Sequence, residues 1–341
     1  MRSILARAAT GFAAAVCATA VLAPVAVADP PPGVVPAATD LVGVGVDTTQ
    51  RFMNRTSADY NAAAAPGLPR LYSWDVTGVN PITPKAGAVT MNRPDGSGPG
   101  FAALITTTLG TLDFVRSSRG VSPGDPRPYS FVPFAKDAVS WSAKAGGHAP
   151  ADLSTAQLRA IYECTATNWL QIDPSLVNAT IKPYLPPATS DTRVAFLKAL
   201  GGGTAILPGT CVTSGPRNDQ GTAPVLDDVD VVFPYSVGVY VDQVYRGHGT
   251  AVESPGPLTP RGINGIVPID SAKNINAPFL ASPYGRLLWH IFRGAEYAGA
   301  NAHGAALRSV FGPQGWICAH PAVIVAYGFV PVGNCGSVIN T

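Results

Sequence analysis

A repeated order of segments limits the folds open to this chain: a short apolar run, a loop rich in Ser, Thr, Asp and Gly, and then a helical pattern. The order occurs three times, in residues 40–61, 87–110 and 181–203. Strands that alternate with helices predict a parallel sheet, and ligands of such sheets bind at the carboxyl ends of the strands. We therefore expect an α/β fold, with its hydroxyl-rich loops beside a ligand cleft.

The first two units place hydroxyl groups where helices begin. Leu41–Val46 is the expected strand of the first unit, and Asp47-Thr48-Thr49 is the expected cap of its helix. In the second unit Ser97 precedes Gly98 and Pro99. A hydroxyl satisfies free N–H groups and proline suits a first turn, so Ser97 is expected to cap a helix. Residues 111–120 add a strand that ends at Ser117-Ser118.

Further along the chain, Ser154 and Gln157 have the spacing of a capping box. The loop of the third unit, Thr189–Thr192, precedes a helix that Gly201 ends. Two β-rich segments, residues 129–143 and 229–237, are long enough to carry the chain from one lobe to another. We expect lobe 1 to comprise residues 29–127 and 234–341, and lobe 2 to comprise residues 128–233.

The first 28 residues have the pattern of a signal peptide. Arg2 and Arg7 precede an apolar run, and Ala26-Val27-Ala28 is the small-x-small pattern of a cleavage site. Cys17 follows the bulky Val16, so a lipid anchor is not expected. We predict a secreted or cell-envelope protein that has no membrane span once the signal is removed, because no other stretch approaches about 20 apolar residues.

Four cysteines remain in the exported chain: Cys164, Cys211, Cys318 and Cys335. An even number in an exported protein predicts two disulfides, and three pairings are possible. We favour the sequential pairing, Cys164–Cys211 and Cys318–Cys335, because each bond then closes a local loop. Metal ligation requires close Cys and His spacing, which this sequence lacks, so no metal site is expected.

Composition and motifs exclude other classes. Charged residues make up 13% of the chain and the net charge is +2, so there is no basic stripe for nucleic acid. Gly120–Gly124 fits the G-x-S-x-G pattern of hydrolases, but that pattern requires a helix directly after it and the sequence DPRPYS follows. The phosphate-loop pattern is absent as well. We therefore predict a protein that is neither an enzyme nor dependent on a cofactor.

The order of the hydroxyl loops resembles that of the ligand loops in type 2 periplasmic binding proteins, most closely the phosphate-binding protein of the phosphate ABC transporter. The resemblance covers residues 40–335 approximately. The segments that carry it are GVGVDTTQRFMNRTSADYN, RPDGSGPGFAAL, DFVRSSRG, LSTAQLRAIYECTATNW and PPATSDTRVAFL.

This resemblance implies two α/β lobes joined by two crossover strands, with a small anion between them. Hydroxyl and backbone N–H groups of the loops would donate to the anion oxygens. The positions that match the ligand loops are Asp47, Thr48, Ser97, Gly98, Ser118, Ser190 and Thr192. Arg116, Arg119 or Arg193 either adds positive charge to the site or is a surface arginine.

The chain departs from the family at two of these loops. The lobe 2 loop of the family resembles Arg-Ser-Asp-Gly-Ser-Gly-Thr, whereas residues 186–192 lack the arginine and place Asp191 where glycine is expected. A carboxylate aimed at a dianion repels it unless it accepts a proton from the ligand. In the third loop, Ser118 replaces the acid that takes this proton.

The implied function is capture of a small anion, phosphate in the first place, for the permease of an ABC-type uptake system. An alternative keeps the fold and abandons transport: a secreted or wall-associated binding or interaction protein. Fractionation separates the two, because a membrane-bound protein supports transport and a protein found in the culture medium supports the alternative.

Overall fold

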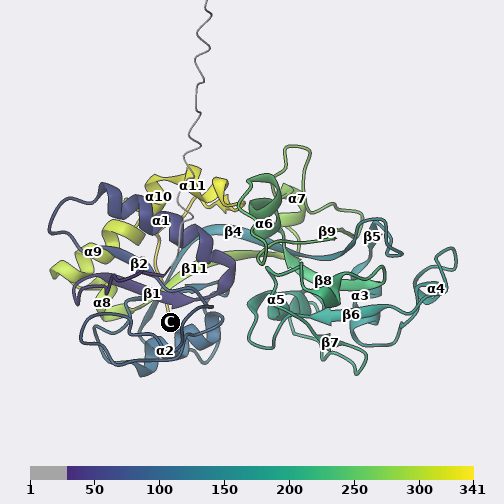
Figure 1. Cartoon of the computed structure of the whole chain (residues 1–341), viewed down its shortest axis with the longest axis horizontal. Helices are drawn as coiled ribbons and strands as arrows, with labels where there is room; N and C mark the ends of the chain where they lie inside the picture. Colours follow the sequence, from purple (N-terminus) through teal and green to yellow (C-terminus); the bar gives the residue numbers. More distant parts are fainter. Residues whose placement is uncertain (1–28) are drawn as a thin grey trace, which may run out of the picture.

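The computed structural model describes residues 29–341, so the predicted signal peptide and Cys17 lie outside the described residues. The chain forms two α/β lobes that lie side by side (Figure 1). In the described chain, eleven strands form one hydrogen-bonded sheet, whose central path runs in the order β2-β1-β3-β11-β4-β8-β6-β7. The expected two-lobed α/β fold is confirmed.

Lobe 1 is built on three parallel strands. β1 (Leu41–Gly45) pairs on one side with β2 (Leu71–Ser73) and on the other with β3 (Phe114–Ser117). The next strand, β11 (Gly285–Arg293), is antiparallel to β3 and to the first part of β4 (Tyr129–Lys144). β1 lies where the strand of the first unit is expected, and β3 lies in the strand expected in residues 111–120. The strand expected at the start of the second unit, residues 87–110, does not form, and the strand that precedes α2 is β2, which the sequence pattern does not predict. The antiparallel strands are additions that the strand–loop–helix order does not predict either.

Helices cover the lobe 1 sheet on both sides. The bounds are a 3₁₀ turn at Asp47–Thr49, then α1 (Gln50–Ala63), α2 (Ser97–Thr106), α8 (Gly294–Ala298), α9 (Ala302–Phe311), α10 (Trp316–Ala319) and α11 (Pro321–Ala326). Phe52, Met53 and Tyr60 of α1 are buried in the core, and their spacing places them on one face of the helix. Two short strands near the C-terminus, β12 (Val330–Pro331) and β13 (Ile339–Asn340), pair with β4.

Lobe 2 repeats the parallel arrangement. β6 (Lys182–Leu185) lies between β8 (Val231–Ser236) and β7 (Thr213–Ser214), and β8 pairs with the second part of β4. The remaining elements are β5 (Asp152–Leu153), α3 (Thr155–Tyr162), α4 (Trp169–Ile172), α5 (Asp191–Leu200), a 3₁₀ turn at Pro224–Leu226, α6 (Val237–Tyr240), a π-helical turn at Val241–Tyr245, β9 (Leu258–Pro260), β10 (Gly262–Ile263) and α7 (Ala277–Leu280).

The capping box of α3 is confirmed. The Ser154 hydroxyl accepts the Gln157 N–H at 3.1 Å, and the Gln157 side chain accepts the Ser154 N–H at 2.8 Å. Both N–H groups at this helix start therefore have partners, which fixes where α3 begins. From there Leu158 and Ile161 enter the lobe 2 core.

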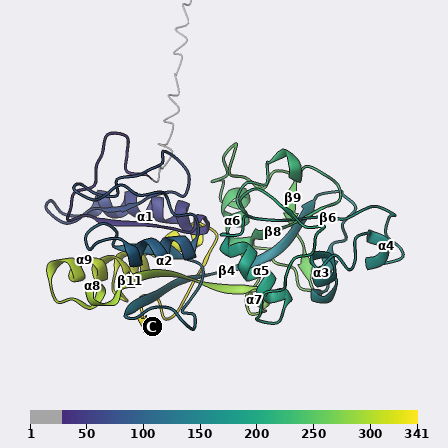
Figure 2. The same ribbon diagram turned by 90° about the horizontal axis from the view of Figure 1, so that it is seen from below.

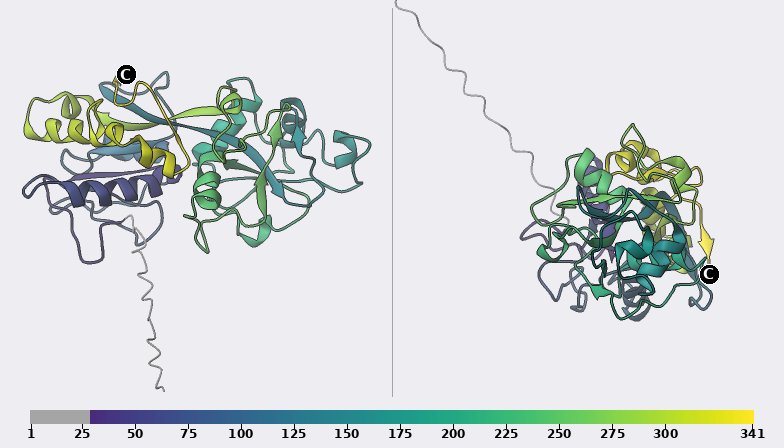
Figure 3. Two further views of the ribbon diagram at one scale, coloured as in Figure 1. Left: turned by 90° about the horizontal axis from the view of Figure 1, so that it is seen from above. Right: turned by 90° about the vertical axis from the view of Figure 1, so that its right-hand side faces the viewer.

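Two long strands connect the lobes. β4 and β11 run together from one lobe toward the other (Figures 2 and 3), and the β11 residues Gly285–Arg293 pair with residues 129–138 of β4. The predicted first crossover, residues 129–143, is the strand β4. The two ends of this strand lie in different cores, because Phe134 packs in one cluster and Trp141 in another.

The predicted second crossover, residues 229–237, is wrong. β8 is hydrogen-bonded inside lobe 2 between β6 and β4. The later strands also belong to that side: β9 pairs with the second part of β4, β10 pairs with β5, and Phe279 of α7 packs in the same core as Trp141. The return to lobe 1 is therefore made by β11, about 50 residues later than the predicted boundary at residue 234.

Both predicted disulfides are confirmed. Cys164 bonds to Cys211, and Cys318 bonds to Cys335. The first joins the end of α3 to the loop before β7, and the second joins α10 to the segment after β12. Each disulfide therefore cross-links two segments of the same lobe. Within residues 29–341, the helices are too short or too polar to cross a membrane.

Candidate functional site

A carboxylate joins the starts of two helices from opposite lobes. Asp191 is the first residue of α5 in lobe 2, and its Oδ2 accepts a hydrogen bond of 2.8 Å from the backbone N–H of Ser97, the first residue of α2 in lobe 1. Free N–H groups and the helix dipole make a helix N-terminus attractive to anions. Two such ends therefore meet at one negatively charged group.

The lobes touch at Gly96, directly before α2. Its φ angle is +111°, and a Cβ atom built there would lie only 2.4 Å from the backbone oxygen of Thr189. Both the backbone conformation and the space exclude a side chain at this position. Glycine thus lets the loop before α2 lie against the loop before α5.

Ser97 does not have the expected capping role. The residue before α2, at the N-cap position, is Gly96, and the Ser97 hydroxyl accepts the N–H of Ser118 at 2.9 Å. Ser118 follows β3, so this bond ties the second predicted loop to the third. A similar correction applies to the first loop, where Asp47–Thr49 form a 3₁₀ turn that leads into α1.

Several polar groups here are buried without a protein partner. The hydroxyls of Ser118 and Ser190 have no hydrogen-bond partner in the described part of the chain, and the two residues are only 5% and 8% exposed. Nη1 of Arg286 is also buried without one among residues 29–341. Buried polar groups normally have partners, so this concentration of unsatisfied hydroxyl and guanidinium groups indicates a binding site.

Arg286 touches both lobes. Its Nη2 lies 2.8 Å from Asp137 Oδ2, 3.1 Å from the Thr192 hydroxyl and 3.4 Å from the Thr48 hydroxyl. Thr48 belongs to lobe 1 and Thr192 to lobe 2. The position of the guanidinium is fixed because Arg286 and Asp137 lie opposite each other on β11 and β4.

A second connection runs through Asn218. The Thr192 hydroxyl donates to the amide oxygen of Asn218 at 2.9 Å, and the amide nitrogen of Asn218 donates to Asp47 at 2.8 Å. Thr192 and Asn218 are completely buried. These bonds extend the contact between the lobes from α5 to the start of α1.

Arg217 is surrounded by acids. It lies 3.4 Å from Asp47, 3.6 Å from Asp95 and 3.5 Å from Asp219. Burial alone would lower the pKa of Arg217, but the attraction of these carboxylates raises it. Burial and the neighbouring Asp47 raise the pKa of Asp219 to about 7. The interface therefore holds more carboxylates than arginines.

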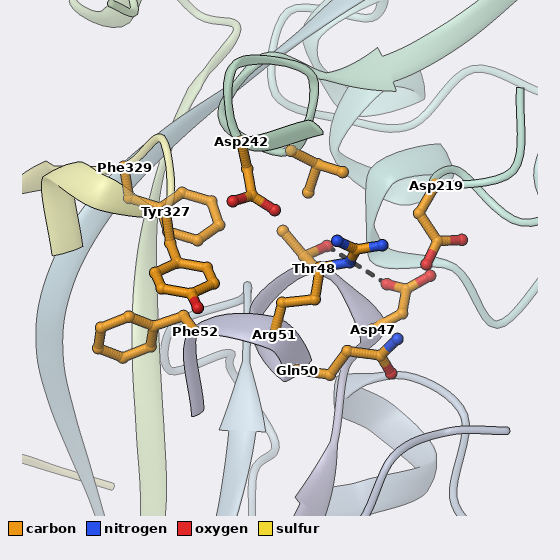
Figure 4. Close-up of a pocket in the computed structure, with 10 residues that line it drawn as sticks. Asp47, Thr48, Gln50, Arg51, Phe52, Asp219, Asp242, Tyr327 and Phe329 are labelled. Carbon is orange, nitrogen blue, oxygen red and sulfur yellow. Dashed lines mark hydrogen bonds between the residues drawn. The ribbon is translucent and has the colours of Figure 1, made fainter. Parts of the chain in front are cut away.

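A small cavity of about 10 Å³ lies beside this cluster, with room for about one water molecule. Figure 4 shows Arg51 reaching between Asp242 on one side and Asp47 and Asp219 on the other, with Tyr327 and Phe329 beside them. Arg51 also pairs with Glu253 at 3.0 Å. This cavity is lined by charges that already have partners and leaves little room for a solute.

Most of the predicted ligand residues lie in the contact between the lobes. Five of them form hydrogen bonds with one another or with Asn218, Asp191 and Arg286. These five are Asp47, Thr48, Ser97, Ser118 and Thr192. Ser190 precedes α5 and is buried. Gly98 is exposed in the first turn of α2, so its place in the ligand set stays a prediction.

The candidate arginines from the sequence lie elsewhere. Arg116 is fully buried and donates to the carbonyl oxygens of Val46 and Trp74. Arg119 pairs with Asp125, and Arg193 donates to the carbonyl of Pro186. Each therefore supports a loop.

The cationic residues that do reach the site are Arg217 and Arg286, and sequence reasoning missed both. Neither stands in a hydroxyl-rich loop at the end of a predicted strand. Arg286 is recognisable only from the pairing of β11 with β4, which brings residues 149 positions apart into contact.

This arrangement of lobes and facing helix starts defines a two-lobed binding protein. The family model described as "PBP superfamily domain" matches residues 72–272. That span is more than half of the chain, and the chain belongs to the PBP superfamily. A search of curated proteins gave no match.

Solved structures with the same fold are distant in sequence. An ABC-type phosphate transport receptor from Vibrio cholerae has a TM-score of 0.56 at 16% identity, over 85% of this chain and 99% of that one. An ABC transporter substrate-binding protein with bound phosphate from Clostridium perfringens has a TM-score of 0.57 at 13% identity, over 86% and 99%. A phosphate-binding protein from Stenotrophomonas maltophilia has a TM-score of 0.52 at 15% identity, over 87% and 91%.

Proposed function

We propose that this chain is an extracytoplasmic solute-binding protein that captures a small oxyanion, phosphate in the first place, between its two lobes. The observation that carries the proposal is the bond between the Ser97 N–H and Asp191. A donor at the start of α2 already holds a carboxylate oxygen, so the position suits an oxygen of a small anion.

Further donors are available around this position. The Ser118 and Ser190 hydroxyls and Nη1 of Arg286 are buried without a partner in residues 29–341. A hydrogen bond between such a group and an ionised oxygen is worth about twice a neutral one. An oxyanion would satisfy several of these groups at once and would join lobe 1 to lobe 2.

Family membership and the printed descriptions of the structural neighbours support the same class of function. Three neighbours are described as a phosphate transport receptor, a substrate-binding protein with bound phosphate and a phosphate-binding protein. We extend this role to the present chain, with the permease of an ABC transporter as its partner and the space outside the cytoplasmic membrane as its location.

One observation favours a second candidate, a binding or interaction protein of this fold with no role in transport. Carboxylates are abundant between the lobes: Asp47, Asp95 and Asp219 surround Arg217, and Asp191 holds the Ser97 N–H. This negative charge opposes a dianion. In this second case the lobes are held together by the chain itself, and no anion is required.

The first test is thermal unfolding of dialysed protein in phosphate, sulfate or small carboxylates, with sodium chloride at equal ionic strength as the control. A ligand that binds only the folded chain stabilises it by about 2.7 kcal/mol at a hundredfold excess over its Kd. We expect phosphate to raise Tm above the chloride control. An unchanged Tm with every anion overturns the proposal and leaves the interaction protein.

A pair of serine variants localises the site. Ser118→Ala removes a buried hydroxyl from it, whereas Ser309→Ala removes the hydroxyl of an exposed residue of α9. Ser118→Ala loses one hydrogen bond to the anion, which is worth about 1 kcal/mol, so its phosphate binding should be about fivefold weaker. Equal phosphate affinity in the two variants would place the anion elsewhere on the protein.

A further inference from the structure

Asp191 occupies an unusual place for a carboxylate in an anion-binding cleft. It is 8% exposed, it starts α5, and its Oδ2 contacts the N–H that starts α2. Two helix N-termini thus stabilise its negative charge from opposite lobes. The same two ends are the groups to which an anionic ligand would be attracted.

The charges around Asp191 come from several elements. Arg286 on β11 is the cation that acts on it, and Asp47 before α1 and Asp95 before α2 are the acids. Burial raises the pKa of Asp191 and the neighbouring Asp47 adds to this, whereas hydrogen bonds from Ser97 and the charge of Arg286 lower it. Its surroundings therefore both hold the carboxylate in place and oppose its ionisation.

We propose that Asp191 is a built-in competitor for the anion site: its carboxylate takes the position of a ligand oxygen at the Ser97 N–H, and an anion binds only after this side chain is displaced. The proposal rests on the proposed function and adds the residue that sets its affinity. A glycine or a neutral side chain at this position would leave the donors of both helices to the ligand.

The competition also gives Asp191 a part in holding the two lobes together. The contact of Gly96 with Thr189 is tight, and the Asp191 bond lies directly beside it. A negative charge that bridges the two helix starts does what a captured anion does in a binding protein of this shape. Removal of Asp191 should therefore transfer this bridging role to an added anion.

Sulfate binding to three variants tests the proposal. Asp191→Gly removes the competing side chain, Asp191→Asn keeps its shape without its charge, and Asp227→Asn removes one charge from an exposed aspartate outside the site. Calorimetry at low ionic strength and neutral pH gives the Kd of each, after far-UV circular dichroism has shown that the variant is folded. The Asn variant keeps the test decisive if glycine destabilises α5.

We expect both Asp191 variants to bind sulfate about tenfold more tightly than the natural chain, because a charge-assisted hydrogen bond becomes available and a like charge is removed. Asp227→Asn should match the natural chain. Phosphate should follow the same order.

A pH series isolates the charge of Asp191. Burial raises the pKa of Asp191, so this carboxyl takes up a proton at a higher pH than a free aspartate does, whereas sulfate remains a dianion until the solution is strongly acidic. The sulfate affinity of the natural chain should therefore approach that of Asp191→Asn as the pH falls. Asp47 and Asp95 are present in both proteins, so the difference between the two curves reports on Asp191.

The outcomes separate this proposal from the proposed function. Tighter binding in both Asp191 variants supports the competitor. Equal or weaker binding in them, while the natural chain binds phosphate or sulfate, overturns the competitor and leaves the solute-binding function standing. If neither the natural chain nor any variant binds an anion, both proposals are wrong.

Discussion

Asp137 on β4 and Arg286 on β11 form a two-point ion pair where the two crossing strands lie side by side. Nε and Nη2 of Arg286 lie 3.0 and 2.8 Å from Oδ2 of Asp137, and Asp137 is completely buried. Asp137 also accepts the N–H of Gly238 and the hydroxyl of Ser236. This carboxylate therefore joins β4, β11 and the start of α6, and it orients the arginine toward Thr48 and Thr192.

The first prediction concerns this pair. Asp137→Ala leaves a buried guanidinium without its counter-charge, and loss of one partner of a buried pair typically costs about 3–5 kcal/mol. Urea unfolding should show a loss of this size. The control is Lys144→Met, which breaks a half-exposed pair with Asp227 and should cost less than about 1 kcal/mol. Similar losses in both variants would show that the Asp137 pair has no special importance.

The second prediction concerns His290 and acid. Burial, with a smaller contribution from Arg116, lowers the pKa of His290 to about 3. The unfolded chain binds a proton here below about pH 6.5, whereas the folded chain does not. The free energy of unfolding should therefore fall as the pH drops from about 6.5 toward 3, by about 1.4 kcal/mol for each pH unit.

His290→Phe tests this dependence. The ring stacks on Phe134 at 4.6 Å between centroids, so phenylalanine suits the surroundings. The variant cannot take up the proton, and its stability should fall less steeply than that of the natural chain between pH 6.5 and 4. Denaturant unfolding at a series of pH values measures both slopes. Parallel slopes would contradict a neutral buried histidine.

The third prediction concerns the start of α3. Ser154→Ala removes the side-chain acceptor of the Gln157 N–H and should lower the free energy of unfolding by about 1 kcal/mol. Ser154→Asp keeps an acceptor and places a negative charge at the helix N-terminus, so it should stay within a few tenths of a kcal/mol of the natural chain. A loss of equal size in both variants would show that capping is not the cause.

The fourth prediction compares the two disulfides. Cys318 and Cys335 are 17 residues apart, and the chain-entropy model gives their bond about 3 kcal/mol of stabilisation. Cys164 and Cys211 are 47 residues apart, which adds about 1 kcal/mol in the same model. Paired Cys→Ser variants of each bond, unfolded in urea, test the order. A larger loss from the shorter loop would contradict loop entropy as the main effect.

Local patterns in the sequence were sufficient for much of the fold. The alternation of strand, hydroxyl loop and helix predicted the parallel strands β1 and β6, the apolar run of residues 111–120 predicted β3, and the Ser154 and Gln157 spacing predicted the start of α3. The resemblance to periplasmic binding proteins indicated which residues lie in the ligand loops. These features depend on neighbouring residues, because helix starts and buried faces are set within a few positions of the chain.

The contacts at the site were decided by distant pairings. Ser97 and Asp191 are 94 positions apart, and Asp137 and Arg286 are 149 apart. The crossover in β11 escaped prediction for the same reason, since a strand's partner depends on segments far along the chain. Asp191 stood out in the sequence as a departure from glycine. Only the contact between the starts of α5 and α2 brought its carboxylate to the N–H of Ser97, because the charge of one helix start can reach another only when the two lobes meet.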